Sequence, residues 1–148
     1  MDTPDAATVV WRCGRALPES RPRTLSDLFS CARQRAGANV VLVDGEQTAT
    51  WDELDRWSGR LAGAWATTVA RGDRVVIRAA NGLPHLLAEL AAWRLGAIAV
   101  PIFAGWGSER LTELTRMIAP SLTVGDHGLS AADLLTLARS PGASVERV

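Results

Sequence analysis

The sequence predicts an α/β fold in which helices flank a parallel sheet, and three observations support that prediction. From residue 51 onward the pattern alternates between helix and strand, an order typical of parallel strands joined by right-handed crossovers. Capping residues, glycines and prolines mark where the elements begin and end. The 148 residues, 47% hydrophobic and 22% charged, suit one globular domain that buries roughly 70% of its unfolded surface.

The chain divides into three parts. Residues 1–23 form an irregular lead-in with scattered arginine and proline, in which residues 8–11 are a candidate for one short strand. Residues 24–139 carry the regular patterns and are the predicted α/β subdomain. Residues 140–148 are predicted to be a flexible tail.

The first helix and the hairpin that follows it are defined by their ends. A capping box at Thr24 begins a helix whose apolar residues recur at helical spacing, and Gly37 ends it. An apolar run at 40–43, a glycine-containing turn and a return at 47–49 then predict a small β-hairpin.

The second helix has the clearest pattern of the chain. Thr50 and Glu53 form a full capping box, in which each side chain satisfies the other residue's backbone amide. Beyond it, large apolar residues repeat every three or four positions and predict one buried face: Leu54, Trp57, Leu61, Trp65 and Val69.

The remaining elements alternate between strand and helix, with turn residues between them: a strand at 74–80, a helix from Pro84 to Gly96, a strand at 98–103, a helix at 108–118, a strand at 122–124 and a helix from Ser130 to about Arg139. Gly96 is predicted to end its helix in a left-handed cap. Pro120 prevents the helix before it from continuing.

Charge and cysteine content exclude several classes of function. Sixteen basic and sixteen acidic residues cancel, so nothing favours nucleic acid or an anionic membrane as a partner. All the basic residues are arginine, which excludes a P-loop lysine or a Schiff-base lysine. Cys13 and Cys31 are widely spaced, so neither a disulfide framework nor a metal site is expected. The acidic N-terminus resembles no signal peptide and no segment has the ~20 apolar residues of a membrane span, so a cytoplasmic protein is expected.

Two segments carry a resemblance to a known family. Residues 48–54 with Leu61-Ala62, and residues 90–101 (Leu-Ala-Ala-Trp-Arg-Leu-Gly-Ala-Ile-Ala-Val-Pro), resemble the first two core motifs of the adenylate-forming, AMP-binding enzymes. Trp51 stands where tyrosine is usual. Peptide-synthesis adenylation domains usually continue after Pro101 with an aspartate-proline pair, whereas Ile102-Phe103 follow here, so the chain looks closer to acyl-CoA synthetases.

The resemblance implies the N-terminal region of a ligase that is truncated before its phosphate loop. In that family the phosphate loop, the ribose-binding aspartate and the adenylating lysine lie further along the chain. A completed ligase would use ATP, Mg and CoA. The matching region supplies no catalytic residue and no metal ligand, and its cofactor-binding residues stay unknown.

The polar candidates each have a plainer interpretation, which we prefer. His85 lies beside the carboxyl end of a strand, where ligands bind in open α/β sheets, but it is also a first-turn polar residue of a helix. His127 follows Asp126 in what reads as a surface turn. Asn81 is interpreted as a turn and N-cap residue rather than a ligand contact. With no serine or cysteine placed beside either histidine, no catalytic triad is predicted.

The tryptophans divide into two groups. Trp51, Trp57 and Trp65 could form an aromatic pocket, but the last two share the apolar stripe of the second helix and are predicted to pack in the core. Trp106 lies between two glycines with no periodic partner and is a candidate contact for another chain.

Three hypotheses for function remain open. The leading one is a truncated or split N-terminal subdomain of an acyl-CoA-synthetase-like ligase, inactive alone and completed by a second polypeptide or by self-association. Without that completion one face of the sheet is expected to be open and apolar. The others are a non-catalytic binding or regulatory module on the same scaffold, and the remnant of a disrupted gene.

Overall fold

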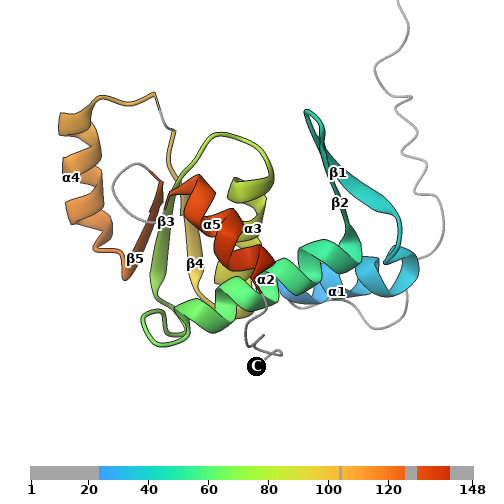
Figure 1. The fold of residues 1–148 in the computed structure, drawn as a ribbon. Coiled ribbons are helices and arrows are strands. Elements are labelled where there is room, and N and C mark those ends of the chain that lie inside the picture. The colour runs from blue at the N-terminus through green and yellow to red at the C-terminus, as the bar shows by residue number, and fades with distance from the viewer. Residues whose placement is uncertain (1–23, 104, 126–129, 141–148) are drawn as a thin grey trace, which may run out of the picture.

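The computed structural model describes residues 24–103, 105–125 and 130–140. The predicted lead-in, with its candidate strand at 8–11, and all but the first residue of the predicted tail lie outside these ranges. The described chain contains helices and strands in an order that matches the predicted one (Figure 1): α1 Leu25–Ala36, β1 Val40–Asp44, β2 Gln47–Thr50, α2 Trp51–Trp65, β3 Arg74–Arg78, α3 Leu83–Arg94, β4 Ile98–Pro101, α4 Ser108–Ile118, β5 Leu122–Gly125 and α5 Ala131–Arg139.

A three-stranded parallel sheet forms the centre of the molecule, which confirms the predicted α/β class. Its strand order is β4-β3-β5, and the central residue of β3, Val76, lies opposite Val100 on one side and Thr123 on the other. Strands β3 and β4 each end two residues earlier than predicted. The hairpin β1–β2 is a separate antiparallel sheet.

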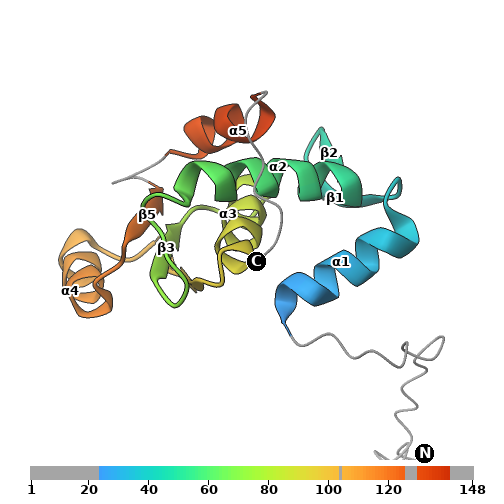
Figure 2. The same cartoon turned by 90° about the horizontal axis from the view of Figure 1, so that it is seen from below.

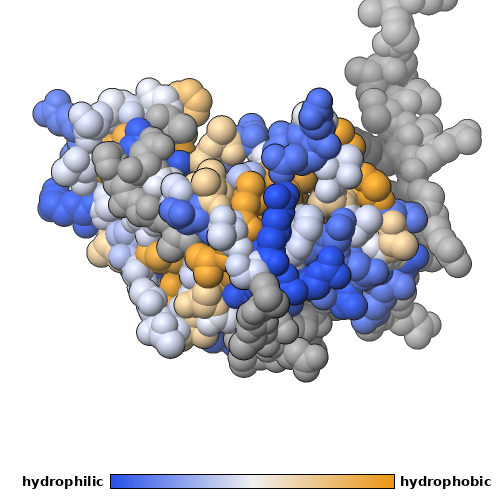
Figure 3. Space-filling model, in the orientation of Figure 1, coloured by the Kyte–Doolittle hydropathy of each residue, from blue (hydrophilic) through white to orange (hydrophobic). Residues whose placement is uncertain are grey.

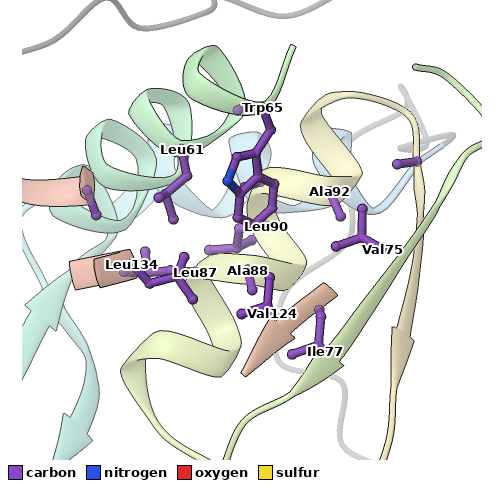
Figure 4. Packing of buried hydrophobic residues seen from close by; sticks show 14 of the residues in the cluster. Leu61, Trp65, Val75, Ile77, Leu87, Ala88, Leu90, Ala92, Val124 and Leu134 are labelled. Carbon is purple, nitrogen blue, oxygen red and sulfur yellow. The ribbon is translucent and has the colours of Figure 1, made fainter. Parts of the chain in front are cut away.

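One face of the sheet and helices α2, α3 and α5 enclose the main core. Val75 and Ile77 of β3 point toward this core, where α2 contacts both α3 and α5 (Figures 2 and 4). The predicted stripe of α2 supplies Leu54, Leu61 and Trp65 to it. The helix itself ends at Trp65, whose carbonyl accepts the N–H of Val69 at 2.8 Å, so Val69 is buried from a turn rather than from the helix.

The tryptophans of α2 pack as individuals and not as a pocket. Trp65 is buried, whereas Trp57 is partly exposed and carries the Arg139 guanidinium 5.4 Å from its ring centre. Trp51 meets Phe29 of α1 edge to face, with ring centres 5.2 Å apart.

The opposite face of the sheet is partly covered, which corrects the expectation of an open face. Val76 points to this side and packs with Ile102 and with Leu111 of α4 in a small second cluster. Figure 1 shows α4 on the side of the sheet away from α2, α3 and α5. The sequence of α4 has its own apolar stripe, and that stripe reaches the sheet within the same chain.

Helix α1 is attached differently from the others, because none of its residues is buried. Its predicted capping box is confirmed, with Thr24 Oγ1 accepting the Asp27 N–H at 3.0 Å. Arg33 near its C-terminal end pairs with Asp52 at 2.9 Å and Asp55 at 3.2 Å, both on α2. These ion pairs and the contact between Phe29 and Trp51 link it to the rest of the fold.

Candidate functional site

A hollow of about 350 Å³ lies at the carboxyl ends of β3 and β4. Open α/β sheets bind ligands at this edge, because the strand ends and the following helix N-termini converge there. We call it the strand-end hollow and define it by the residues that line it: Ala79, Ala80, Asn81, His85, Pro101, Ile102 and Phe103. The two polar residues that sequence reasoning singled out near this strand, His85 and Asn81, therefore do lie together.

The first turn of α3 forms one wall of the hollow, and a residue distant in sequence caps it. Gly82 is the N-cap, with φ 148° and ψ −169°, and it has no side chain to offer the helix. Instead Asp44 at the end of β1 accepts the Leu83 N–H on its Oδ2 at 3.0 Å. Asn81 is exposed and precedes the N-cap, so the prediction that it caps α3 is wrong. The carboxylate of Asp44, from the hairpin, caps the helix instead, and its negative charge suits the positive N-terminal end of α3.

His85 is held by its own helix and strand. Its Nδ1 lies 3.1 Å from the Ala79 carbonyl oxygen, which can only accept, so Nδ1 carries the proton and donates it. Its Nε2 lies 3.6 Å from Glu89 Oε1, one helical turn further along. The ring is thus oriented at the rim of the hollow. The hollow has no serine or cysteine among its lining residues, so these contacts assemble no nucleophile and base.

An aromatic loop borders the hollow on the β4 side. Phe103 is 69% exposed, and a Cβ on Gly105 would come within 2.6 Å of Phe103 Cε1, so this position requires glycine as long as the ring stays there. Trp106 is 36% exposed and does have a partner, since Arg110 of α4 lies 4.9 Å from its ring centre. Phe103 was missed as a site residue because an apolar residue at a strand end gives no signal of exposure.

The other candidates do not join this site. His127 and Cys13 fall outside the described residues. Cys31 is a free, partly exposed thiol on α1. Within residues 24–103, 105–125 and 130–140, no three His, Cys, Asp or Glu side chains are grouped to hold a metal ion. None of the described helices is both long and apolar enough to cross a bilayer.

Two carboxylates have shifted pKa values, and both serve turns or caps. The Thr50 N–H, and then the Thr50 hydroxyl, bond to Glu53 and lower its carboxyl pKa. The pKa of Asp73 is lowered by the Ala70 N–H, at 2.8 Å, and then by a hydrogen bond from the Ser121 side chain. In both cases the donated hydrogen bonds favour the charged form of a carboxylate that holds a nearby turn or cap. These two carboxylates therefore contribute to the fold rather than to a reactive centre.

The chain matches known proteins over most of its length. The family model described as "AMP-binding enzyme" matches residues 8–146. "Protein Y" of Streptomyces griseus is 32% identical over 102 residues, covering 68% of this chain and 33% of that protein. The putative fatty-acid–CoA ligase FadD21 of Mycobacterium tuberculosis is 31% identical over 122 residues, covering 72% of this chain and 21% of the ligase. The chain thus spans a third or less of the length of these relatives.

Solved structures show the same fold. The N-terminal subdomain of Klebsiella oxytoca NpsA, in complex with 3-hydroxyanthranilyl-AMSN, superposes with a TM-score of 0.74 at 21% identity, covering 84% of this chain and 33% of that one. VinN superposes with a TM-score of 0.76 at 21% identity, covering 87% of this chain and 39% of its own. The family match over 8–146 and the shared fold agree with the two sequence motifs. The chain belongs to the AMP-binding enzyme family and corresponds to the N-terminal part of its adenylate-forming members.

Proposed function

We propose that this chain is the N-terminal scaffold of an acyl-CoA-synthetase-like ligase and is inactive until other parts complete it. The single observation that carries the proposal is how the lengths compare. The family model matches residues 8–146 of this chain, whereas the chain covers only 33% and 21% of the length of two relatives. The completed ligase would activate a carboxylate with ATP as an acyl-adenylate and then transfer the acyl group to a thiol, with CoA as the acceptor that the acyl-CoA synthetases favour.

The described residues do not by themselves fit the groups that such a reaction uses. They contain no group of three or more His, Cys, Asp or Glu side chains that could hold a magnesium ion. The short glycine segment before α4 has no lysine beside it, and its Gly107 offers open space rather than a cradle. We therefore assign ATP, Mg and CoA to the completed ligase and derive no chemical step through them in this chain.

The contribution of this chain is to position one wall of a cleft. Asp44 accepts a hydrogen bond from Leu83 and so links the hairpin to the first turn of α3. His85 within that turn and Asn81 just before the helix both line the hollow. Parallel strands β3 and β4 end at the same edge and place Phe103 across from them. A wall built in this way shapes a ligand site without supplying reactive groups to it.

A protein partner is proposed for the missing parts, with self-association as the alternative. Several large apolar side chains are exposed on the described surface, and they lie on different elements: Val43, Ile98, Phe103 and Met117. On the face shown in Figure 3, apolar residues reach the surface in several separate places. The balanced charge favours no nucleic acid, and the cysteine content suits the cytoplasm.

The test is affinity purification of the tagged chain from its native cell, followed by mass spectrometry. A stoichiometric partner that carries a glycine-lysine-glycine phosphate loop and the adenylating lysine is expected. Recovery of an intact ligase instead would identify a regulatory module. Recovery of chaperones alone would indicate a gene remnant and would overturn the proposal.

A further inference from the structure

The residues that line the strand-end hollow limit the kind of ligand group that it can hold. Five of the seven are apolar, and the two polar ones, Asn81 and His85, lie just before α3 and within its first turn. The sequence has no lysine, and none of the seven lining residues is an arginine. Small-molecule sites are mostly apolar, with a few polar groups that fix the orientation of the ligand. The hollow therefore suits the uncharged part of a ligand.

The helix N-terminus beside the hollow is poorly suited to a phosphate. Phosphates bind where free backbone N–H groups or basic side chains converge. At the start of α3 the Leu83 N–H is bonded to Asp44 Oδ2 at 3.0 Å, and Pro84 has no N–H. The Nε2 of His85 lies 3.6 Å from Glu89 Oε1, so this side of the hollow carries two carboxylates. A nucleotide phosphate would be repelled here.

The volume of the hollow limits the size of the group. At about 350 Å³ it has room for about a dozen atoms other than hydrogen, since a water molecule takes up about 30 Å³ in the liquid. An aryl ring or a short acyl chain fits this space. A whole nucleotide and a long fatty-acyl chain both exceed it.

We propose that the strand-end hollow holds the apolar body of the carboxylate substrate, an aryl ring or a short acyl chain, with the carboxylate at the mouth beside Asn81. This inference rests on the proposed function. The exposed amide of Asn81 can donate a hydrogen bond to a carboxylate oxygen. Glu89 would repel a carboxylate placed against the His85 ring. The exposed ring of Phe103 offers a flat apolar surface at the rim.

This orientation separates binding from chemistry. The apolar body is held by the ends of β3 and β4 and by the loop that carries Phe103. The carboxylate faces outward, toward the groups that the completed ligase would supply. The hollow would then select substrates by size without contributing a catalytic residue.

Titration of the isotope-labelled full chain, followed by nuclear magnetic resonance, tests the proposal. The probes are benzoate, its uncharged analogue benzamide, and ATP, and the readout is the backbone amide signals of Ala80, Asn81 and Phe103. Phe103→Ala removes the ring at the rim. Met117→Ala is the matched control, because Met117 on α4 is also 69% exposed but does not line the hollow. Asn81→Asp places a negative charge at the mouth.

Benzoate and benzamide are expected to shift these signals with similar affinity, and ATP is expected to leave them in place. Phe103→Ala should weaken the binding of both probes several-fold, whereas Met117→Ala should weaken neither. Asn81→Asp should weaken benzoate several-fold more than benzamide, because only benzoate brings a second negative charge to the mouth.

Three results would overturn the inference: no shift with benzoate, equal loss of binding in Phe103→Ala and Met117→Ala, or the same signals shifted by ATP. An equal effect of Asn81→Asp on benzoate and benzamide would contradict the orientation of the carboxylate. Exchange of pyrophosphate into ATP by the chain together with its partner tests the proposed function separately. Exchange without benzoate binding in the hollow would overturn this inference alone, and binding without exchange would overturn the proposed function alone.

Discussion

The contact between Gly82 and Asp44 allows a quantitative test of how the hairpin supports the strand-end hollow. Gly82 has a φ of 148° and a ψ of −169°, a region that is essentially restricted to glycine and costs other residues about 1–3 kcal/mol. A Cβ at this position would also come within 2.5 Å of Asp44 Oδ2. Gly82→Ala therefore adds strain and displaces the carboxylate that caps α3.

The expected free energies follow from these two effects. Asp44→Ala removes the cap and lowers the free energy of unfolding by about 1 kcal/mol. Gly82→Ala adds the backbone strain and also removes the cap, so it should lower the free energy of unfolding by about 2–4 kcal/mol in total. In the double variant the cap is lost only once, so the two losses are expected to be non-additive by about 1 kcal/mol.

Urea unfolding followed by far-ultraviolet circular dichroism measures these values, provided that the m-values stay equal. Gly72→Ala is the matched control, because Gly72 has a φ of 84° but nothing within 4 Å of its would-be Cβ. It should be destabilising without coupling to Asp44. Asp44→Asn retains an acceptor oxygen and should lose only a few tenths of a kcal/mol. Strict additivity between Gly82→Ala and Asp44→Ala would refute the account of the cap.

Four further predictions concern activity, acid stability, the core and the surface. His85→Ala should leave turnover of the completed ligase within a few-fold of normal, and a hundredfold loss in a carboxylate-dependent assay would make His85 catalytic. The lowered pKa of Glu53 adds stability that is present above its unfolded pKa and lost as pH falls through its folded pKa, so Glu53→Gln should reduce the loss of unfolding free energy between pH 7 and about pH 3. Leu61→Ala should lower the free energy of unfolding by about 2–5 kcal/mol. Trp106→Ala should change the free energy of unfolding by about 0.5 kcal/mol or less, because the side chain is partly exposed, while it weakens capture of the partner. Equal partner binding by the wild-type chain and the variant would show that Trp106 is not part of the interface.

Local sequence chemistry was enough to predict the elements themselves. The capping boxes at Thr24 and Thr50 and the helix start at Ser130 each depend on residues within one helical turn. Hydrogen bonds from the predicted residues confirm all three positions, and at Ser130 the side chain accepts the Asp133 N–H. Gly96 has the predicted left-handed φ, at 68°. Gly37 ends α1 as predicted but is right-handed, and its glycine is explained by Asp52, whose Oδ2 would lie 2.6 Å from a Cβ there.

Contacts between distant segments were not predictable in the same way. Asp44 is 39 residues from the amide that it caps, and a sequence pattern that resembles a hairpin turn does not reveal that contact. The expectation of an open sheet face was only partly right, because the apolar stripe of α4 covers Val76 within the same chain while Ile98 of β4 stays exposed. For the candidate site, the sequence placed His85 at the correct strand edge, whereas Phe103 became recognisable only when β4 ended early and left it exposed.

The central claim is that this chain supports an adenylating ligase and does not catalyse the reaction alone. Carboxylate-dependent exchange of pyrophosphate into ATP tests it most directly, with the purified chain, the co-purified partner and the two together assayed at equal concentrations. The account predicts exchange only in the mixture. Exchange by the purified chain alone, or by the partner at the same rate with and without this chain, would contradict it.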